Sequence, residues 1–104
     1  MSKKISQDAA NAFENNKKFS RKNTRVCKNP FGGMDMFLHG NLIASSRTGD
    51  LIIQNRGFFT KTTKERLNAL RGVDIVQKNF TWFLNGKKWN GLPCNPLDPS
   101  TIKD

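Results

Sequence analysis

The feature that most limits the fold is a run of short apolar segments, separated by turn residues, between Met34 and Trp89. Met34, Met36 and Leu38 alternate with Asp35, Phe37 and His39, which is typical of a strand with one buried face. Similar segments follow at residues 42–46, 51–54, 73–77 and 81–84. Their length and spacing predict an antiparallel meander of β-strands.

The turns between these segments carry their own signals. Asn85-Gly86 joins residues 81–84 to Lys87-Lys88-Trp89, and this dipeptide favours the positive φ angles of a type I′ hairpin turn. Gly40-Asn41 predicts a second tight turn, and Thr48-Gly49-Asp50 predicts a third.

A helix is expected at the amino-terminal end, over about residues 6–17. Ser6 is a favourable N-cap, and Ala9, Ala12 and Phe13 then fall on one helical face. Lys17 and Lys18 would lie in the last turn, where positive charge suits the helix dipole.

A second, short helix is expected between the strands. Thr62-Thr63-Lys64-Glu65 matches a capping box and predicts a helix through Leu70. Leu67 and Leu70 would face the core, and Gly72 would end the helix.

The fold class is therefore α+β, with one antiparallel sheet of five or six strands, an N-terminal helix and one inserted helix. The 104 residues form one domain, in which residues 1–28 pack with residues 29–91. Residues 92–104 contain three prolines and are expected to be a loose tail. The predicted core consists of Phe13, Met36, Leu38, Leu42, Ile52, Leu67, Leu70, Ile75 and Trp82.

Charge is the strongest indication of function. Eighteen lysines and arginines oppose eight aspartates and glutamates, which gives a net charge of +10. Such an excess favours a polyanion such as DNA, RNA or an acidic protein. The alternative is solubility alone, for which a net charge of about 2–8 is enough. No apolar run approaches the length of a membrane span and no signal peptide follows Met1, so we expect no membrane partner and a cytoplasmic location.

Basic residues gather in three places. The segment from 17 to 28 contains six basic residues and no acidic one, and the Asn29–Gly33 turn after it is expected to act as a hinge. Other basic residues surround the second helix, whose N-terminus could also hold a phosphate, and the last hairpin. The predicted nucleic-acid-binding residues are Lys17, Lys18, Arg21, Lys22, Arg25, Lys28, Lys61, Lys64, Arg66, Arg71, Lys87 and Lys88. The alternative is that each is an ordinary solvated side chain.

Aromatic residues lie among these lysines, as in proteins that stack nucleic-acid bases. Phe58, Trp82 and Trp89 are the candidate stacking residues. A small domain must also build its core from such rings, so burial is the competing interpretation. Because successive side chains of a strand point to opposite faces, either Trp82 or Phe83 is expected to be exposed.

Catalytic chemistry has little support. His39 is the one histidine, and nothing places it beside Cys27 or Ser45 as a nucleophile–base pair. One histidine and two distant cysteines do not make a zinc site, and the carboxylates are too scattered for a metal-dependent nuclease. We therefore expect no enzyme activity, no cofactor and no metal. Cys27 and Cys94 are expected to be free thiols.

Three motifs resemble a set of small bacteriophage proteins, namely Leu38-His39-Gly40-Asn41-Leu42-Ile43-Ala44, the helix from Thr62 to Leu70, and Trp82-Phe83-Leu84-Asn85-Gly86. The resemblance covers about residues 35–91. It implies a phage accessory protein that acts inside an infected bacterium. Because no activity is assigned to that set, it carries over no functional residue.

Two functions follow as hypotheses. The first is a non-enzymatic nucleic-acid-binding protein that uses the basic residues named above. The second is a phage inhibitor of a host machine, such as a CRISPR or restriction complex or RNA polymerase, that masks an acidic surface or a nucleic-acid channel.

Overall fold

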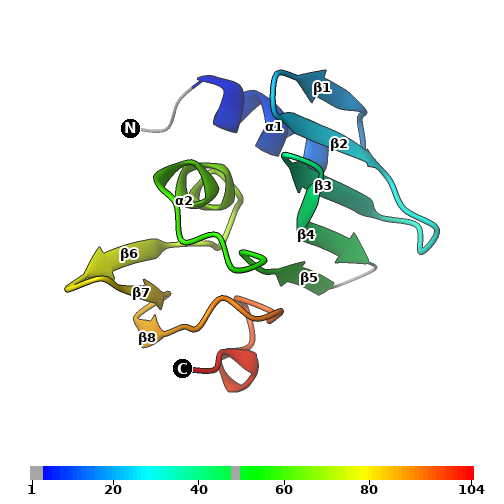
Figure 1. The fold of residues 1–104 in the computed structure, drawn as a ribbon. Helices are drawn as coiled ribbons and strands as arrows, with labels where there is room; N and C mark the ends of the chain where they lie inside the picture. Colours follow the sequence, from blue (N-terminus) through cyan, green and yellow to red (C-terminus); the bar gives the residue numbers. More distant parts are fainter. Residues whose placement is uncertain (1–3, 48–49) are drawn as a thin grey trace.

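The structure, a computed structural model, describes residues 4–47 and 50–104 (Figure 1). The chain runs through α1 (Lys4–Glu14), β1 (Phe19–Arg21), β2 (Thr24–Lys28), β3 (Met34–Leu38), β4 (Asn41–Arg47), β5 (Asp50–Ile53), α2 (Lys61–Asn68), β6 (Ile75–Lys78), β7 (Thr81–Leu84), β8 (Lys87–Lys88) and a 3₁₀ turn at Pro99–Thr101. The predicted α+β class is confirmed. The strands form two sheets rather than one, with orders β1-β2-β3-β4-β5 and β6-β7-β8.

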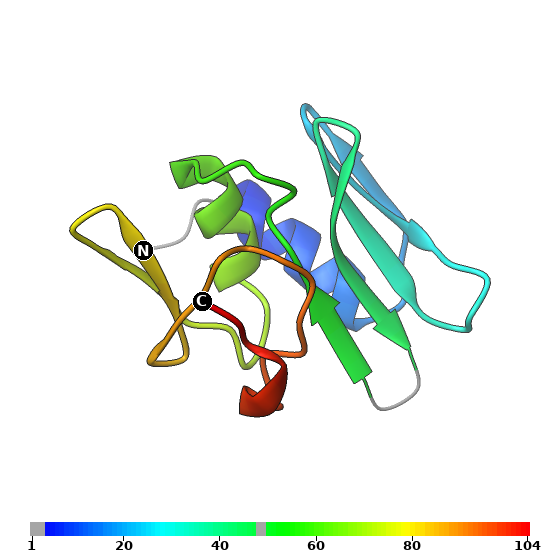
Figure 2. The same cartoon turned by 60° about the horizontal axis from the view of Figure 1, so that its bottom comes forward.

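Both sheets are antiparallel meanders. In the five-stranded sheet, the paired residues Val26, Met36, Ala44 and Ile53 lie side by side and are buried. Helix α1 packs on this inner face and contacts β1, β2 and β3. Helix α2 contacts α1, β4 and β6, so it joins the two sheets, which lie on either side of it in both views (Figures 1 and 2).

A β-bulge explains why Leu42 is not in the core as predicted. Met36 pairs with Ala44 but Phe37 pairs with Leu42, which leaves Ile43 as an extra residue. The extra residue reverses which side chains face inward, so Ile43 and Ala44 are buried while Leu42 is only half-buried. Ile52 pairs with Ser45 on the outer face, and Ile53 takes its place in the core. The other predicted core residues are buried, namely Phe13, Met36, Leu38, Leu67, Leu70, Ile75 and Trp82.

The predicted turns are close to the observed ones. Asn85 and Gly86 have φ angles of 51° and 87°, as a type I′ turn requires. The turn between β3 and β4 is formed by His39 and Gly40, at φ angles of 52° and 79°, one residue earlier than predicted. The turn predicted at Thr48-Gly49 lies outside the described residues.

Helix α1 is shifted toward the N-terminus relative to the prediction. Ser6 is buried inside the helix rather than capping it. The helix ends at Glu14 because Asn16 has a φ of 57° and the Lys17 N–H donates to the Ala12 carbonyl, as in a Schellman motif. Lys17 and Lys18 therefore lie beyond the helix.

The N-cap of helix α2 lies two residues before the predicted capping box. Thr60 is the N-cap, and its hydroxyl accepts a hydrogen bond of 3.2 Å from the Thr63 N–H. The helix ends at Asn68, with Ala69 as its C-cap, rather than at Leu70.

The C-terminal residues are packed and do not form the predicted loose tail. Cys94 pairs through both backbone groups with Ile53 at the edge of the five-stranded sheet. The Asn85 amide donates to the Pro96 carbonyl at 2.9 Å, and Ile102 is only 5% exposed. The prolines in this segment do not prevent it from packing against the rest of the fold.

Candidate nucleic-acid interface

The basic segment from residue 17 to residue 28 is part of the sheet and is not a hinged arm. β1 pairs with β2, and β2 pairs along its whole length with β3. The turn after it is also held in place. The Asn29 carboxamide oxygen accepts from the Phe31 and Gly33 N–H groups, and its nitrogen donates to the Ser46 carbonyl. Gly33 approaches that carbonyl so closely that a Cβ would overlap it.

Most charges of the β1–β2 hairpin are free. Lys17, Lys18, Lys22 and Lys28 are exposed. Arg21 instead donates to Asp8 of α1 at 2.9 Å, and this hydrogen bond lowers the pKa of the Asp8 carboxyl. Arg21 therefore attaches the hairpin to α1 and is not fully available to a ligand.

Arg25 lies on the outer face of the same sheet, where it is paired with an aromatic residue. It stands opposite Phe37 in the register of β2 and β3, and its guanidinium carbon lies 4.9 Å from the ring centroid. A groove of about 440 Å³ beside this pair is also lined by Lys22, Asn23 and His39. This groove combines a cation, an aromatic ring and an imidazole, which are the groups that contact phosphates and bases.

The charge of this part of the chain is strongly positive. Residues 17–47 contain seven basic and one acidic side chain, a difference of +6 with histidine neutral. The acidic one, Asp35, accepts hydrogen bonds from the Asn29 amide at 3.1 Å and from the Ser45 hydroxyl at 2.7 Å. We call Lys17, Lys18, Lys22, Arg25 and Lys28, with Phe37, the basic surface.

Arg66 was predicted to bind nucleic acid, and this is wrong because the side chain is only 4% exposed. Its guanidinium donates to Thr24 and Ser6 at 2.8 Å each and to Asn23 at 3.3 Å. Burial lowers its pKa. Helical spacing could have indicated this role, since residues 63, 66 and 67 share the buried face of α2.

The remaining predicted cations do not join the basic surface. Lys61 is exposed at the start of α2, and Lys64 donates to the Gln77 carboxamide at 2.8 Å. Lys87 donates to the Pro99 carbonyl at 2.8 Å, and Lys88 is exposed. Strands β6–β8 lie on the other side of α2 from β1 and β2 (Figures 1 and 2).

The N-terminus of α2 is only partly available for a phosphate. The Thr63 and Lys64 N–H groups already donate to the Thr60 hydroxyl and carbonyl. The Thr63 side chain is buried. The Thr63 and Lys64 N–H groups are therefore not free for the phosphate that was expected at this N-terminus.

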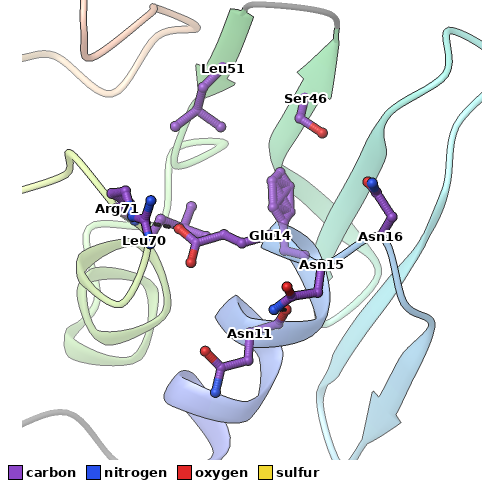
Figure 3. A pocket seen from close by; sticks show the side chains of 9 residues that line it. Asn11, Glu14, Asn15, Asn16, Ser46, Leu51, Leu70 and Arg71 are labelled. Carbon is purple, nitrogen blue, oxygen red and sulfur yellow. Dashed lines mark hydrogen bonds between the residues drawn. The ribbon is translucent and has the colours of Figure 1, made fainter.

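Arg71 is exposed and lines a separate cavity of about 480 Å³. Its backbone N–H donates to the Glu14 carboxylate at 2.7 Å. Figure 3 shows Glu14 reaching from the end of α1 toward Leu70 and Arg71, with asparagines on the other wall. This cavity mixes both charges and is unlike the basic surface.

Two of the three candidate stacking residues are in the core. Trp82 and Trp89 are buried, with ring centroids 6.1 Å apart, and Phe59 packs edge-on against Trp82 at 5.1 Å. Phe58 is half-exposed and lines a cavity of about 240 Å³. Sequence reasoning missed Phe37 as a partner of Arg25, because that pairing depends on the register of β2 and β3.

Possible metal-ligating side chains are scattered over the part of the chain that the structure describes. Within residues 4–47 and 50–104, no three histidine, cysteine, aspartate or glutamate side chains lie together as metal ligands. Cys27 and Cys94 are free thiols, and burial raises the pKa of Cys94 to about 11. None of the described helices is long and apolar enough to cross a bilayer.

Comparison with known proteins gives one match. The family model described as Kyanoviridae Gp96 protein matches residues 2–96. No curated protein and no solved structure matches the chain. The match covers nearly the whole sequence and agrees with the resemblance to small bacteriophage proteins. The chain therefore belongs to the Kyanoviridae Gp96 family, a family of phage proteins.

Proposed function

We propose that this phage protein binds nucleic acid without catalysing a reaction, in the cytoplasm of the infected bacterium. The observation that carries the proposal is the basic surface: four exposed lysines on the β1–β2 hairpin and the two residues before it, beside an arginine that lies over an aromatic ring. Each lysine placed near a phosphate releases condensed counterions, which adds affinity that does not depend on sequence.

The order of the hairpin adds to the argument. The like charges of the basic surface are carried by one strand pair and the residues beside it, so they repel one another. A polyanion removes this repulsion, and the ordered backbone means that little conformational entropy is lost on binding. The five exposed cations of the basic surface would neutralise about five phosphates, which corresponds to a slope of log K against log salt near −4.5 for duplex DNA.

The test is a charge-removal variant with a matched control. Lys17→Gln, Lys18→Gln, Lys22→Gln and Arg25→Gln together should weaken binding to DNA or RNA by at least about tenfold and flatten the salt slope by about one unit per lost contact. The control changes Arg56, Lys61, Arg71 and Lys103 to Gln; these are exposed residues outside the basic surface. It removes the same net charge and should retain most of the affinity.

The outcomes separate the alternatives. Absence of binding to any strand at low salt would refute the proposal. Equal losses in both variants would mean that net charge alone, and not the basic surface, attracts nucleic acid.

The second candidate function is inhibition of a host machine through an acidic surface. Its support is the phage family together with the same excess of positive charge. A pull-down from host lysate with and without nuclease distinguishes the two. A host protein retained in stoichiometric amount after nuclease treatment would favour inhibition, and loss of all partners would favour nucleic-acid binding.

A further inference from the structure

The tip of the β6–β7 hairpin presents an aromatic ring to solvent. Phe80 is 96% exposed, and this hairpin projects away from the rest of the chain (Figure 2). Asn79 and Phe80 form the turn with φ angles of 48° and 67°. A bulky residue is unfavourable in this left-handed region, and Gly is preferred there. The fold therefore holds a phenylalanine where neither burial nor local backbone preference stabilises it.

The outer face of the three-stranded sheet continues this apolar tip. Val76, Phe83 and Lys88 lie side by side in the register, and Lys78 pairs with Thr81 on the same face. Val76 is 43% exposed and Phe83 is half-buried. The opposite face is closed, because Ile75, Trp82 and Leu84 are in the core. An aromatic and aliphatic strip bordered by two lysines is left open.

The positive charge of this hairpin indicates what kind of partner can bind the strip. Residues 75–89 contain three lysines and no acidic residue. A second copy of the chain would bring the same positive charge to the contact, within a molecule of net charge +10, so self-association is disfavoured. The occupant must be anionic and must also offer a flat apolar surface to Phe80. An unpaired nucleic-acid base flanked by phosphates meets both requirements.

We propose that the β6–β7 hairpin stacks Phe80 on an unpaired base, with Lys78 and Lys88 contacting the neighbouring phosphates. This inference rests on the proposed nucleic-acid binding and narrows it to single-stranded segments. The molecule measures 35 × 27 × 22 Å, so one flexible strand can pass from the basic surface to the hairpin. Stacked bases inside a duplex are not accessible to Phe80.

The experiment compares single-stranded and blunt duplex oligonucleotides of about 16 units, within the range of known single-strand sites. Phe80→Ala should weaken single-strand binding by roughly tenfold or more and change duplex binding less than about twofold. Phe80→Trp should retain single-strand binding. Leu92→Ala removes another exposed apolar side chain, 59% exposed, outside the hairpin, and should alter neither affinity.

A second measurement does not depend on affinity. A fluorescent adenine analogue in the single strand should change emission when the wild-type protein binds it, and Phe80→Ala should abolish that change. If Phe80→Ala keeps the single-strand affinity and the emission change of the wild-type protein, the inference is overturned and the proposed function still stands. Failure of the wild-type protein to bind any strand would overturn both. If the wild-type protein retains a host protein after nuclease treatment and Phe80→Ala loses it, Phe80 is instead assigned to protein docking.

Discussion

At the residue scale, Arg66 shows how a charged side chain becomes structural. Its guanidinium has five N–H donors, and three neutral oxygens accept from it, on Thr24, Ser6 and Asn23. These acceptors belong to α1, to the β1–β2 turn and to the start of β2, whereas Arg66 belongs to α2. One side chain therefore joins three elements of the fold.

Removing this side chain should be costly. We expect Arg66→Ala to reduce the free energy of unfolding by roughly 2–4 kcal/mol, because it leaves buried hydroxyl and amide groups unpaired and opens a cavity. Arg71→Ala is the control: its side chain is exposed, so the change should be within about 0.5 kcal/mol. Urea denaturation of both variants measures the difference. Equal stabilities would contradict the structural role of Arg66.

The aromatic residues divide by environment in a similar way. Trp82 and Trp89 have the chemistry of stacking residues but pack against one another and Phe59. Neither Phe37 nor Phe80 is among the stacking residues predicted from the sequence. Phe37 lies under the Arg25 guanidinium, and Phe80 projects from a turn. Residue type alone does not separate the two groups.

At the element scale, the C-terminal segment completes the core. Cys94 extends the edge of β5 through paired backbone hydrogen bonds. The Asn95 carbonyl also accepts a hydrogen bond of 2.9 Å from the Thr101 hydroxyl. These bonds fold residues 94–101 back on themselves and bring Ile102 to the core.

The segment should therefore contribute to stability. We predict that Ile102→Ala lowers the free energy of unfolding by about 2–4 kcal/mol, as expected for a buried aliphatic side chain. Leu97→Ala serves as the comparison, since Leu97 is 65% exposed. Thermal denaturation followed by circular dichroism tests this. A melting temperature of Ile102→Ala equal to that of Leu97→Ala would mean that the segment is detached in solution.

At the scale of the whole molecule, the two sheets share one core. Helix α2 contacts β4 of one sheet and β6 of the other. Arg66 links α2 to α1 and β2, and Cys94 links the C-terminal segment to β5. No element in the described ranges forms a separate apolar core.

The chain should then unfold as one cooperative unit. Trp82 and Trp89 are its two tryptophans and it has no tyrosine, so intrinsic fluorescence reports on the three-stranded sheet. Circular dichroism reports mainly on the helices and the larger sheet. We expect equal denaturation midpoints from the two probes. A fluorescence transition at lower denaturant would show that β6–β8 unfolds independently.

Features that depend only on neighbouring residues can be predicted from the sequence. The Asn85-Gly86 turn, the alternation along β3 and the buried face of α2 at Leu67 follow from local backbone and spacing preferences. Together they predict the α+β class and most of the core. The net charge is also known from the sequence, and the expectation of an anionic partner follows from it.

Which side chains are available to a ligand depends on the three-dimensional fold. Arg66 and Ser6 are 60 residues apart in the chain, and the extra residue at Ile43 is defined only by the pairing of two strands. The same holds for Arg25 over Phe37 and for the burial of both tryptophans. Contacts between distant segments set these features, and no local pattern encodes which long-range contacts form, because burial depends on what the rest of the chain places against a residue.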